Sequence, residues 1–283
     1  GRGRGKGGDP VSIFVNKEDL PYRRIFAAID LEAFRTNLES IRGILPKGTK
    51  LCAVVKADAY GHGVKGLLGS LSGYADAYAV ATEEEGALLR REGVTAPILV
   101  LGALQREEYR RAICCGLTVA ISSLREAEGL SQEAETLYGT AHVHIAVETG
   151  MNRIGMRMEG EGFEELRKIA ALPGISIDGC FTHFARADEA DAVMTARQLG
   201  RFQDFLQRAK EAGIHTGVRH CSNSAAILEG EGTDFDMVRA GIAMYGIYPS
   251  DEVRMETPLE PVMQLKSYLT FVKEIEAGET VSY

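Results

Sequence analysis

The sequence predicts an α/β protein built on a (β/α)8 barrel of the TIM type, followed by the beginning of a second, β-rich domain. Short apolar, β-branched runs alternate with longer amphipathic stretches along most of the chain. The runs are apolar throughout, as in parallel strands buried on both faces. No GxGxxG loop follows any of them, which argues against an open dinucleotide-binding sheet.

The expected elements follow one another in a regular order. A strand at Ile25–Asp30 precedes a helix at Leu31–Leu45, whose apolar residues recur at helical spacing until a proline and a glycine end it. Eight further strands are expected at Leu51–Val55, Ala77–Ala81, Pro97–Leu101, Leu117–Ile121, Val143–Val147, Ile177–Phe181, Gly217–Cys221 and Met237–Ile242. Helices are expected at Glu83–Glu92, Arg106–Cys115, Leu124–Leu137, Gly162–Leu172 and Ala192–Ala212. Eight strands that alternate with helices predict a closed barrel.

The two ends of the chain break this rhythm. Residues 1–24 begin with GRGRGKGG, which lacks the apolar stretch of a signal peptide and is typical of a flexible tail or linker. Residues 25–245 form the expected barrel domain. Residues 246–283 are expected to start a C-terminal β domain, because Met263–Ile275 is β-branched and aromatic. A few strands leave open edges, so we expect this domain to be incomplete.

Composition limits the possible partners. The 283 residues are 45% hydrophobic and 25% charged, with a formal net charge of −8, which argues against nucleic acid and anionic membranes. The five cysteines are scattered, without a CxxC pair, so no metal site is expected and a reducing compartment suits them. No apolar run is long enough to span a membrane. We expect a cytoplasmic protein, although the tail is also compatible with an upstream membrane domain.

One lysine lies where barrel enzymes place their chemistry. Lys56 directly follows an expected strand, and the active sites of such barrels lie at the carboxyl ends of the strands. A desolvated lysine there has a lowered pKa and becomes a nucleophilic amine. It can also extend to the barrel rim and reach water. The turn-rich loop that follows, with Tyr60 and its adjacent glycines, can approach an anionic group and favours the nucleophilic interpretation.

Six segments, in order, resemble the alanine racemase family of pyridoxal 5'-phosphate (PLP) enzymes. They are AVVKADAYGHG, ETGMNRIG, FTHFARADE, HCSNSAA, VRAGIAMYG and TVSY, within a resemblance that covers residues 25–283. Basic-amino-acid decarboxylases and small PLP-homeostasis proteins share this barrel but carry other residues after the lysine. The resemblance implies that Lys56 binds PLP covalently.

The resemblance assigns the phosphate of PLP to the loops after the last two strands. The implied binding residues are Tyr60, Ser224, Gly241 and Ile242, with His220 and Asn223 beside them. Ser224 offers a hydroxyl at a helix N-terminus, where free amides favour an anion, and Gly241 lets an amide approach closely. Without the resemblance, a plain helix N-cap would be the usual interpretation of Ser224.

Arg239 determines the expected reaction type. The resemblance places it against the pyridine nitrogen of PLP, supported by His220. Arginine only donates hydrogen bonds and keeps its charge, with a pKa above about 12, so the pyridine stays unprotonated and is a weaker electron sink. Proton return to the substrate Cα is then favoured, which means racemisation over transamination. An ion-paired barrel arginine is the alternative interpretation.

Racemisation needs acid–base groups on both faces of Cα. The resemblance assigns one face to Lys56 and the other to Tyr283, contributed by the second subunit of a homodimer and supported by His183. Apart from the resemblance, Tyr283 is an ordinary strand tyrosine and His183 a satisfied barrel histidine.

The sequence departs from the family pattern beside Arg153. The resemblance implies that Arg153 binds the PLP phenolic oxygen and the substrate carboxylate. Many family members orient this arginine with a carbamylated lysine, but the aligned residue here is Ala146. An anion such as chloride, or Glu148, is the expected substitute. Anomalous scattering that located no anion near Arg153 would exclude the first of these.

The expected function is interconversion of L- and D-alanine, which supplies D-alanine for peptidoglycan. A serine racemase of the same family and a non-catalytic PLP-binding barrel or truncated remnant remain alternatives, the latter because of Ala146 and the abrupt end at Tyr283. A decarboxylase would need a carboxylate near the pyridine nitrogen, where this chain has Arg239.

Overall fold

The computed structural model describes residues 24–283, so nearly all of the tail expected at 1–24 lies outside the described residues. The described residues divide into two compact units, 29–263 and 24–28 with 264–283. Within these residues no helix combines the length and the apolar character needed to cross a membrane.

The larger unit is the predicted barrel. Its eight strands are parallel and lie in the order β8-β7-β6-β5-β4-β3-β2-β9, so the last strand returns to the first. The strands are β2 (Lys50–Val54), β3 (Ala77–Val80), β4 (Ile98–Val100), β5 (Thr118–Ile121), β6 (Ala141–Ala146), β7 (Ile175–Phe181), β8 (Val218–His220) and β9 (Met237–Ala240). Between β8 and β9 the Arg239 N–H donates to the Ser222 carbonyl at 3.0 Å, which bridges the remaining gap.

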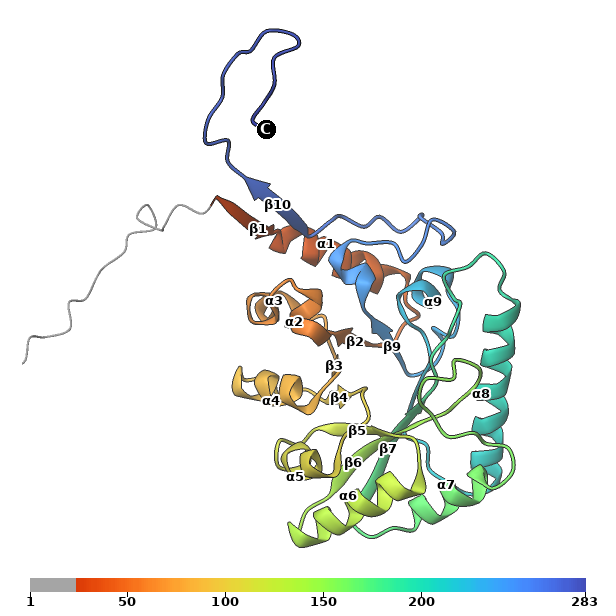
Figure 1. The fold of residues 1–283 in the computed structure, drawn as a ribbon. Helices are drawn as coiled ribbons and strands as arrows, with labels where there is room; N and C mark the ends of the chain where they lie inside the picture. Colours follow the sequence, from red (N-terminus) through yellow and green to blue (C-terminus); the bar gives the residue numbers. More distant parts are fainter. Residues whose placement is uncertain (1–23) are drawn as a thin grey trace, which may run out of the picture. The chain divides into compact units, whose positions relative to one another are not determined.

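Helices cover the outer side of these strands (Figure 1). They are α1 (Leu31–Ile44), α3 (Val64–Leu71), α4 (Glu83–Arg91), α5 (Arg106–Cys114), α6 (Leu124–Thr136), α7 (Gly162–Ala170) and α8 (Val193–Glu211). Two shorter helices, α2 (Lys56–Tyr60) and α9 (Ser224–Glu229), and the 3-10 turn η2 (Ile242–Tyr245) follow strand ends directly. The helices expected from sequence periodicity are all present, and α9 begins at Ser224, where a helix start was expected, whereas α2 and α3 were not predicted.

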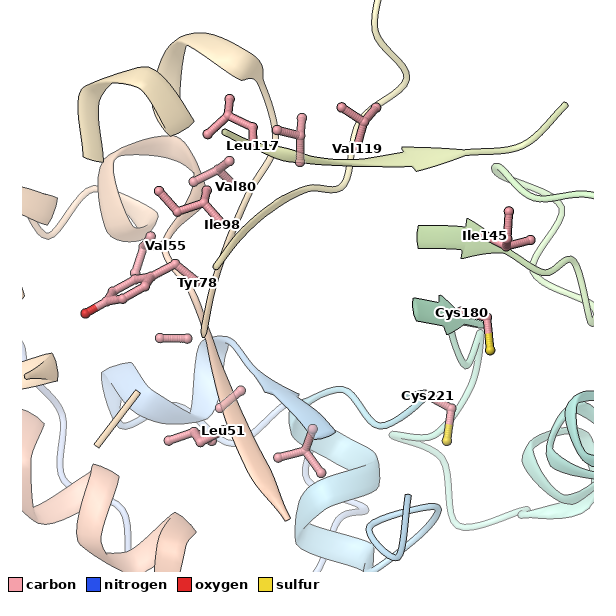
Figure 2. Close-up of a cluster of buried hydrophobic side chains, with 14 of the residues drawn as sticks. Leu51, Val55, Tyr78, Val80, Ile98, Leu117, Val119, Ile145, Cys180 and Cys221 are labelled. Atoms are coloured by element: carbon pink, nitrogen blue, oxygen red, sulfur yellow. The ribbon is translucent and has the colours of Figure 1, made fainter. Parts of the chain in front are cut away.

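Alternate residues of each strand are buried on opposite sides of the barrel wall. In β2, Leu51 and Ala53 join the large cluster between strands and helices, while Cys52 and Val54 join a smaller cluster inside the barrel. Figure 2 shows part of the large cluster, with Leu51, Val55, Tyr78, Val80, Ile98, Leu117, Val119, Ile145, Cys180 and Cys221 labelled. Burial on both faces explains the continuous apolar runs.

Three of the cysteines are small core residues. The side chains of Cys52, Cys180 and Cys221 are fully buried. Burial raises the pKa of each of the three thiols to about 12, so they stay protonated.

The smaller unit contains a two-stranded sheet of β1 (Ile25–Ile29) and β10 (Met263–Ser267). The segment 25–28, which the sequence placed in the barrel domain, therefore pairs with the C-terminal segment. The β structure expected at Met263–Ile275 ends at Ser267, because a strand persists only where a neighbour pairs with it.

Candidate active site

A pocket of about 480 Å³ lies at the carboxyl ends of the barrel strands, a volume in the range of small-molecule sites. Ten of the expected catalytic and binding residues lie in or beside it. Lys56, Tyr60, Arg153, His183, Asn223, Ser224, Arg239, Gly241 and Ile242 line it, and His220 contacts Arg239 from behind. The barrel thus brings together side chains that are up to 186 positions apart, the separation of Lys56 and Ile242 in the chain.

Lys56 begins α2, which is a left-handed turn and not an ordinary helix. Ala57, Asp58, Ala59 and Tyr60 have φ values of 51–56°, a region that non-glycine residues rarely adopt. Such backbone costs about 1–2 kcal/mol per residue and persists only where the surroundings hold it. The turn lets Lys56 and Tyr60 face the same pocket, with the lysine Nζ 5.7 Å from the centre of the tyrosine ring.

Ser224 and Gly241 form a small polar cradle beside Tyr60. The Ser224 Oγ accepts hydrogen bonds from the Gly241 N–H at 2.9 Å and the Ala243 N–H at 3.2 Å. A Cβ at position 241 would lie 2.9 Å from the Tyr60 Oη, so the close approach requires glycine. The N-cap of α9 is Asn223, whose Oδ1 accepts from the Ala226 N–H at 3.1 Å. Ser224 is therefore not the cap, and its hydroxyl is directed to the Gly241 loop.

Arg239 is buried at the centre of the strand ends, with 2% of its surface exposed. Its guanidinium donates to the His220 Nδ1 at 2.7 Å, to the Thr182 and Cys221 carbonyls at 3.0 Å each, and to the His183 Nδ1 at 3.1 Å. All four acceptors are neutral. Burial lowers its pKa from 12.5 to about 10, below the value expected for arginine, and it stays charged at neutral pH.

The donor-only chemistry of Arg239 fixes the protons on its neighbours. His220 must accept at Nδ1, so its proton is on Nε2 and is donated to the Nδ1 of His144, 2.9 Å away. His183 also accepts at Nδ1, which leaves its proton on Nε2. Burial, and secondarily the charge of Arg239, lower the pKa of His183 to about 3. Burial also lowers the pKa of His144 to about 4 and that of His220 well below 6.5.

These three histidines predict acid destabilisation. Above pH 6.5 they are neutral in both the folded and the unfolded chain; below it, the unfolded chain binds protons that the folded chain does not. Stability should therefore fall as the pH decreases from 6.5 toward 4, by about 1.4 kcal/mol per pH unit for each histidine. Urea unfolding at several pH values measures this slope. Because His144→Gln removes one of the three histidines, it should reduce this slope by about 1.4 kcal/mol per pH unit, the equivalent of one proton. An unchanged slope in that variant would contradict the assignment.

Arg153 is exposed and lines the pocket without a hydrogen bond or ion pair to another described residue. Ala146 ends β6 inside the barrel and is 2% exposed. The Glu148 carboxylate accepts from the backbone N–H groups of Gly150 and Asn152, the latter at 2.7 Å. Glu148 therefore orders the loop that carries Arg153 and does not pair with the guanidinium itself.

Tyr283 lies in the smaller unit, 264–283, with its side chain fully exposed. It is the one expected catalytic residue outside the barrel unit.

Comparison with known proteins identifies the family. Residues 29–249 match the family described as "Alanine racemase, N-terminal domain". The chain belongs to the alanine racemase family. It is accordingly an isomerase, as the six ordered segments predicted.

Individual relatives agree over most of the chain. The chain is 42% identical to the alanine racemase of Desulfovibrio desulfuricans and 41% identical to that of Methanococcus maripaludis, covering 92% of this chain and 70% of each relative. Among solved structures, alanine racemase of Clostridium difficile in complex with cycloserine is 38% identical, with a TM-score of 0.85 over 89% of this chain and 70% of that one. That of Bacillus anthracis with bound L-Ala-P is 34% identical, with a TM-score of 0.84 over 93% and 68%.

Two buried residues of this racemase barrel were missed by the sequence reasoning. His144 precedes Ala146 by two positions on β6, so alternation alone could have placed it facing the barrel interior. Gln198 of α8 is fully buried; its amide donates to the His183 carbonyl at 2.9 Å and to the Thr149 Oγ1 at 3.1 Å. No sequence pattern indicates that a glutamine on an amphipathic helix is buried.

Proposed function

We propose that this chain uses PLP to interconvert L- and D-alanine, and that it supplies D-alanine for peptidoglycan. The observation that carries the proposal is the joint placement of Lys56, Arg239 and the Ser224–Gly241 cradle around one pocket. Relatives that are 38–42% identical are alanine racemases by name, which supports alanine as the substrate.

The residues present fit PLP. A phosphate needs donors in a tight space, and the cradle offers the Ser224 and Tyr60 hydroxyls with the backbone amide of Ile242. The Gly241 N–H donates to the Ser224 Oγ and so orients the hydroxyl that would face the phosphate. A pyridine nitrogen is an acceptor, and Arg239 can only donate. An aldehyde needs an amine, which Lys56 supplies.

Each residue then has a defined task. Bound PLP withdraws electron density from the substrate and so acidifies the hydrogen on Cα. The Lys56 amine moves the proton on one face, and the Tyr283 phenol moves it on the other. Arg153 binds the substrate carboxylate, because its planar guanidinium matches that group. Arg239 holds its own proton, which favours proton return to Cα.

We further propose that Tyr283 enters the site of the partner subunit in a homodimer, supported there by His183. A phenol with a pKa of about 10 needs such support to act near neutral pH. Each active site then contains residues of both chains.

The proposal is tested on the purified chain supplied with PLP, by measuring D-alanine formed from L-alanine, with L-serine in parallel. Racemisation of alanine well above that of serine is the expected result. Faster turnover of serine would assign the chain to serine racemisation. Bound PLP without racemisation would favour a non-catalytic barrel.

Mixing two inactive variants tests the shared site. Lys56→Ala and Tyr283→Phe should each be inactive alone. In an equal mixture, half of the dimers are mixed, and each mixed dimer has one site with both native residues, so about one quarter of the wild-type activity should return.

Refolding the two variants together and separately provides the comparison. A mixture as inactive as its components would show that Lys56 and Tyr283 of one chain serve the same site, or that no shared site forms.

A further inference from the structure

A single carboxylate, that of Glu85, holds the start of the left-handed turn. The Glu85 Oε1 accepts from the Ala57 N–H at 2.7 Å. Its Oε2 accepts from the Ala81 N–H at 2.7 Å and more weakly from the Thr82 N–H at 3.4 Å. The side chain thus ties the first residue after Lys56 to the end of the neighbouring strand, β3.

The amide of Ala57 depends on this contact. Two later amides of the turn have backbone acceptors: Ala59 donates to Val55 and Gly61 to Ala57, each at 2.9 Å. The first N–H groups of a helical turn lack such partners. The Glu85 carboxylate serves as the acceptor that the Ala57 N–H would otherwise lack. Because the carboxylate is charged, this hydrogen bond is stronger than one to a neutral carbonyl.

The contact lies beside two pocket residues. Lys56 immediately precedes Ala57, and Tyr60 closes the left-handed run beside Gly241. A left-handed run of non-glycine residues reverts to ordinary backbone unless its ends are held. Reversal of the Ala57 peptide would redirect the Lys56 side chain and withdraw the Tyr60 hydroxyl from the cradle.

We propose that Glu85 is a positioning residue that maintains the left-handed turn, and through it the placement of Lys56 and Tyr60. The consequence for PLP rests on the function proposed above, whereas the effect on the turn does not. Glutamate is required because both oxygens are used: glutamine has one acceptor oxygen, and aspartate is shorter by one methylene.

A helix-capping role is the alternative that the test must separate. Glu85 is the third residue of α4, and its N–H donates to the Thr82 Oγ1 at 3.3 Å in a capping box. Thr82→Ala removes that hydroxyl and leaves the Glu85 carboxylate on the turn. Glu84→Gln changes a neighbouring carboxylate of the same helix whose side chain is 76% exposed.

The experiment is hydrogen–deuterium exchange on the full chain without cofactor, followed by titration with PLP. In Glu85→Gln and Glu85→Asp, the amides of residues 57–61 should exchange about ten-fold faster or more, the effect of losing a hydrogen bond to a charged group. PLP affinity should fall by a similar factor. Thr82→Ala should accelerate exchange in α4 only, and Glu84→Gln should match the wild type.

The outcomes separate the proposals. Unchanged exchange of residues 57–61 in both Glu85 variants overturns the positioning role, as does faster exchange confined to α4. Glu85→Asp keeps a negative charge at the start of α4, so it remains informative if Glu85→Gln does not fold. A wild-type chain that binds no PLP would contradict the proposed function and leave the exchange result on the turn decisive.

Discussion

Replacement of Lys56 by alanine should abolish racemisation, by about 10⁴-fold or more, because it removes both the amine that binds PLP and the base on one face of Cα. Lys56 follows the end of β2 and is the only lysine among the described residues that line the pocket. No other amine there can therefore replace it. Borohydride reduction should attach the cofactor permanently to the peptide that contains Lys56 in the wild type and not in the variant. Mass spectrometry of the digested protein measures this directly.

Lys65→Ala is the matched control. Lys65 lies on α3, is 63% exposed and pairs with Glu92 at 2.6 Å, a surface contact of small energy. Activity and labelling should both be retained in this variant. Labelling of Lys56→Ala at another lysine, with activity retained, would show that the cofactor is bound elsewhere.

The barrel was predictable because each strand is buried on both faces. Leu51 and Cys52 point to opposite sides of the wall, and both are apolar, so the pattern survives in the sequence as a continuous run. The left-handed turn was not predictable in this way. Ala57 and Ala59 have no propensity for positive φ, and their backbone is held by contacts such as that of Glu85, 28 positions away.

The candidate site shows the same division. Lys56 and Arg239 could be placed at strand ends by counting along apolar runs and by the family motifs. Gln198 could not, because its partners Thr149 and His183 lie on other segments and only the fold brings them together. Ser224 illustrates a subtler limit: its position beside the helix start was correct, but the neighbouring Asn223 is the cap.

Arg239→Met should lower racemisation by about 10²–10³-fold, the usual cost of removing one donor aimed at a reacting group. It should also destabilise the fold. Four acceptors, three of them on buried residues, lose their donor, at about 1–3 kcal/mol each. Relief of the buried charge offsets part of this, by about 3 kcal/mol according to the decrease in pKa from 12.5 to about 10. The unfolding free energy measured by urea denaturation is therefore expected to fall by about 1–9 kcal/mol.

Arg219→Met separates this effect from the general loss of a barrel arginine. Arg219 lies on β8, 44% exposed, and pairs with Asp236 at 2.7 Å, so its loss should cost less than about 1 kcal/mol and leave racemisation intact. Arg239→Lys keeps the charge but concentrates its donors on one nitrogen, which cannot reach both His220 and His183 in the geometry of the guanidinium. It should therefore regain stability more fully than activity. Equal recovery of both would mean that the positive charge alone, and not the forked donor between the two histidines, is what the site requires.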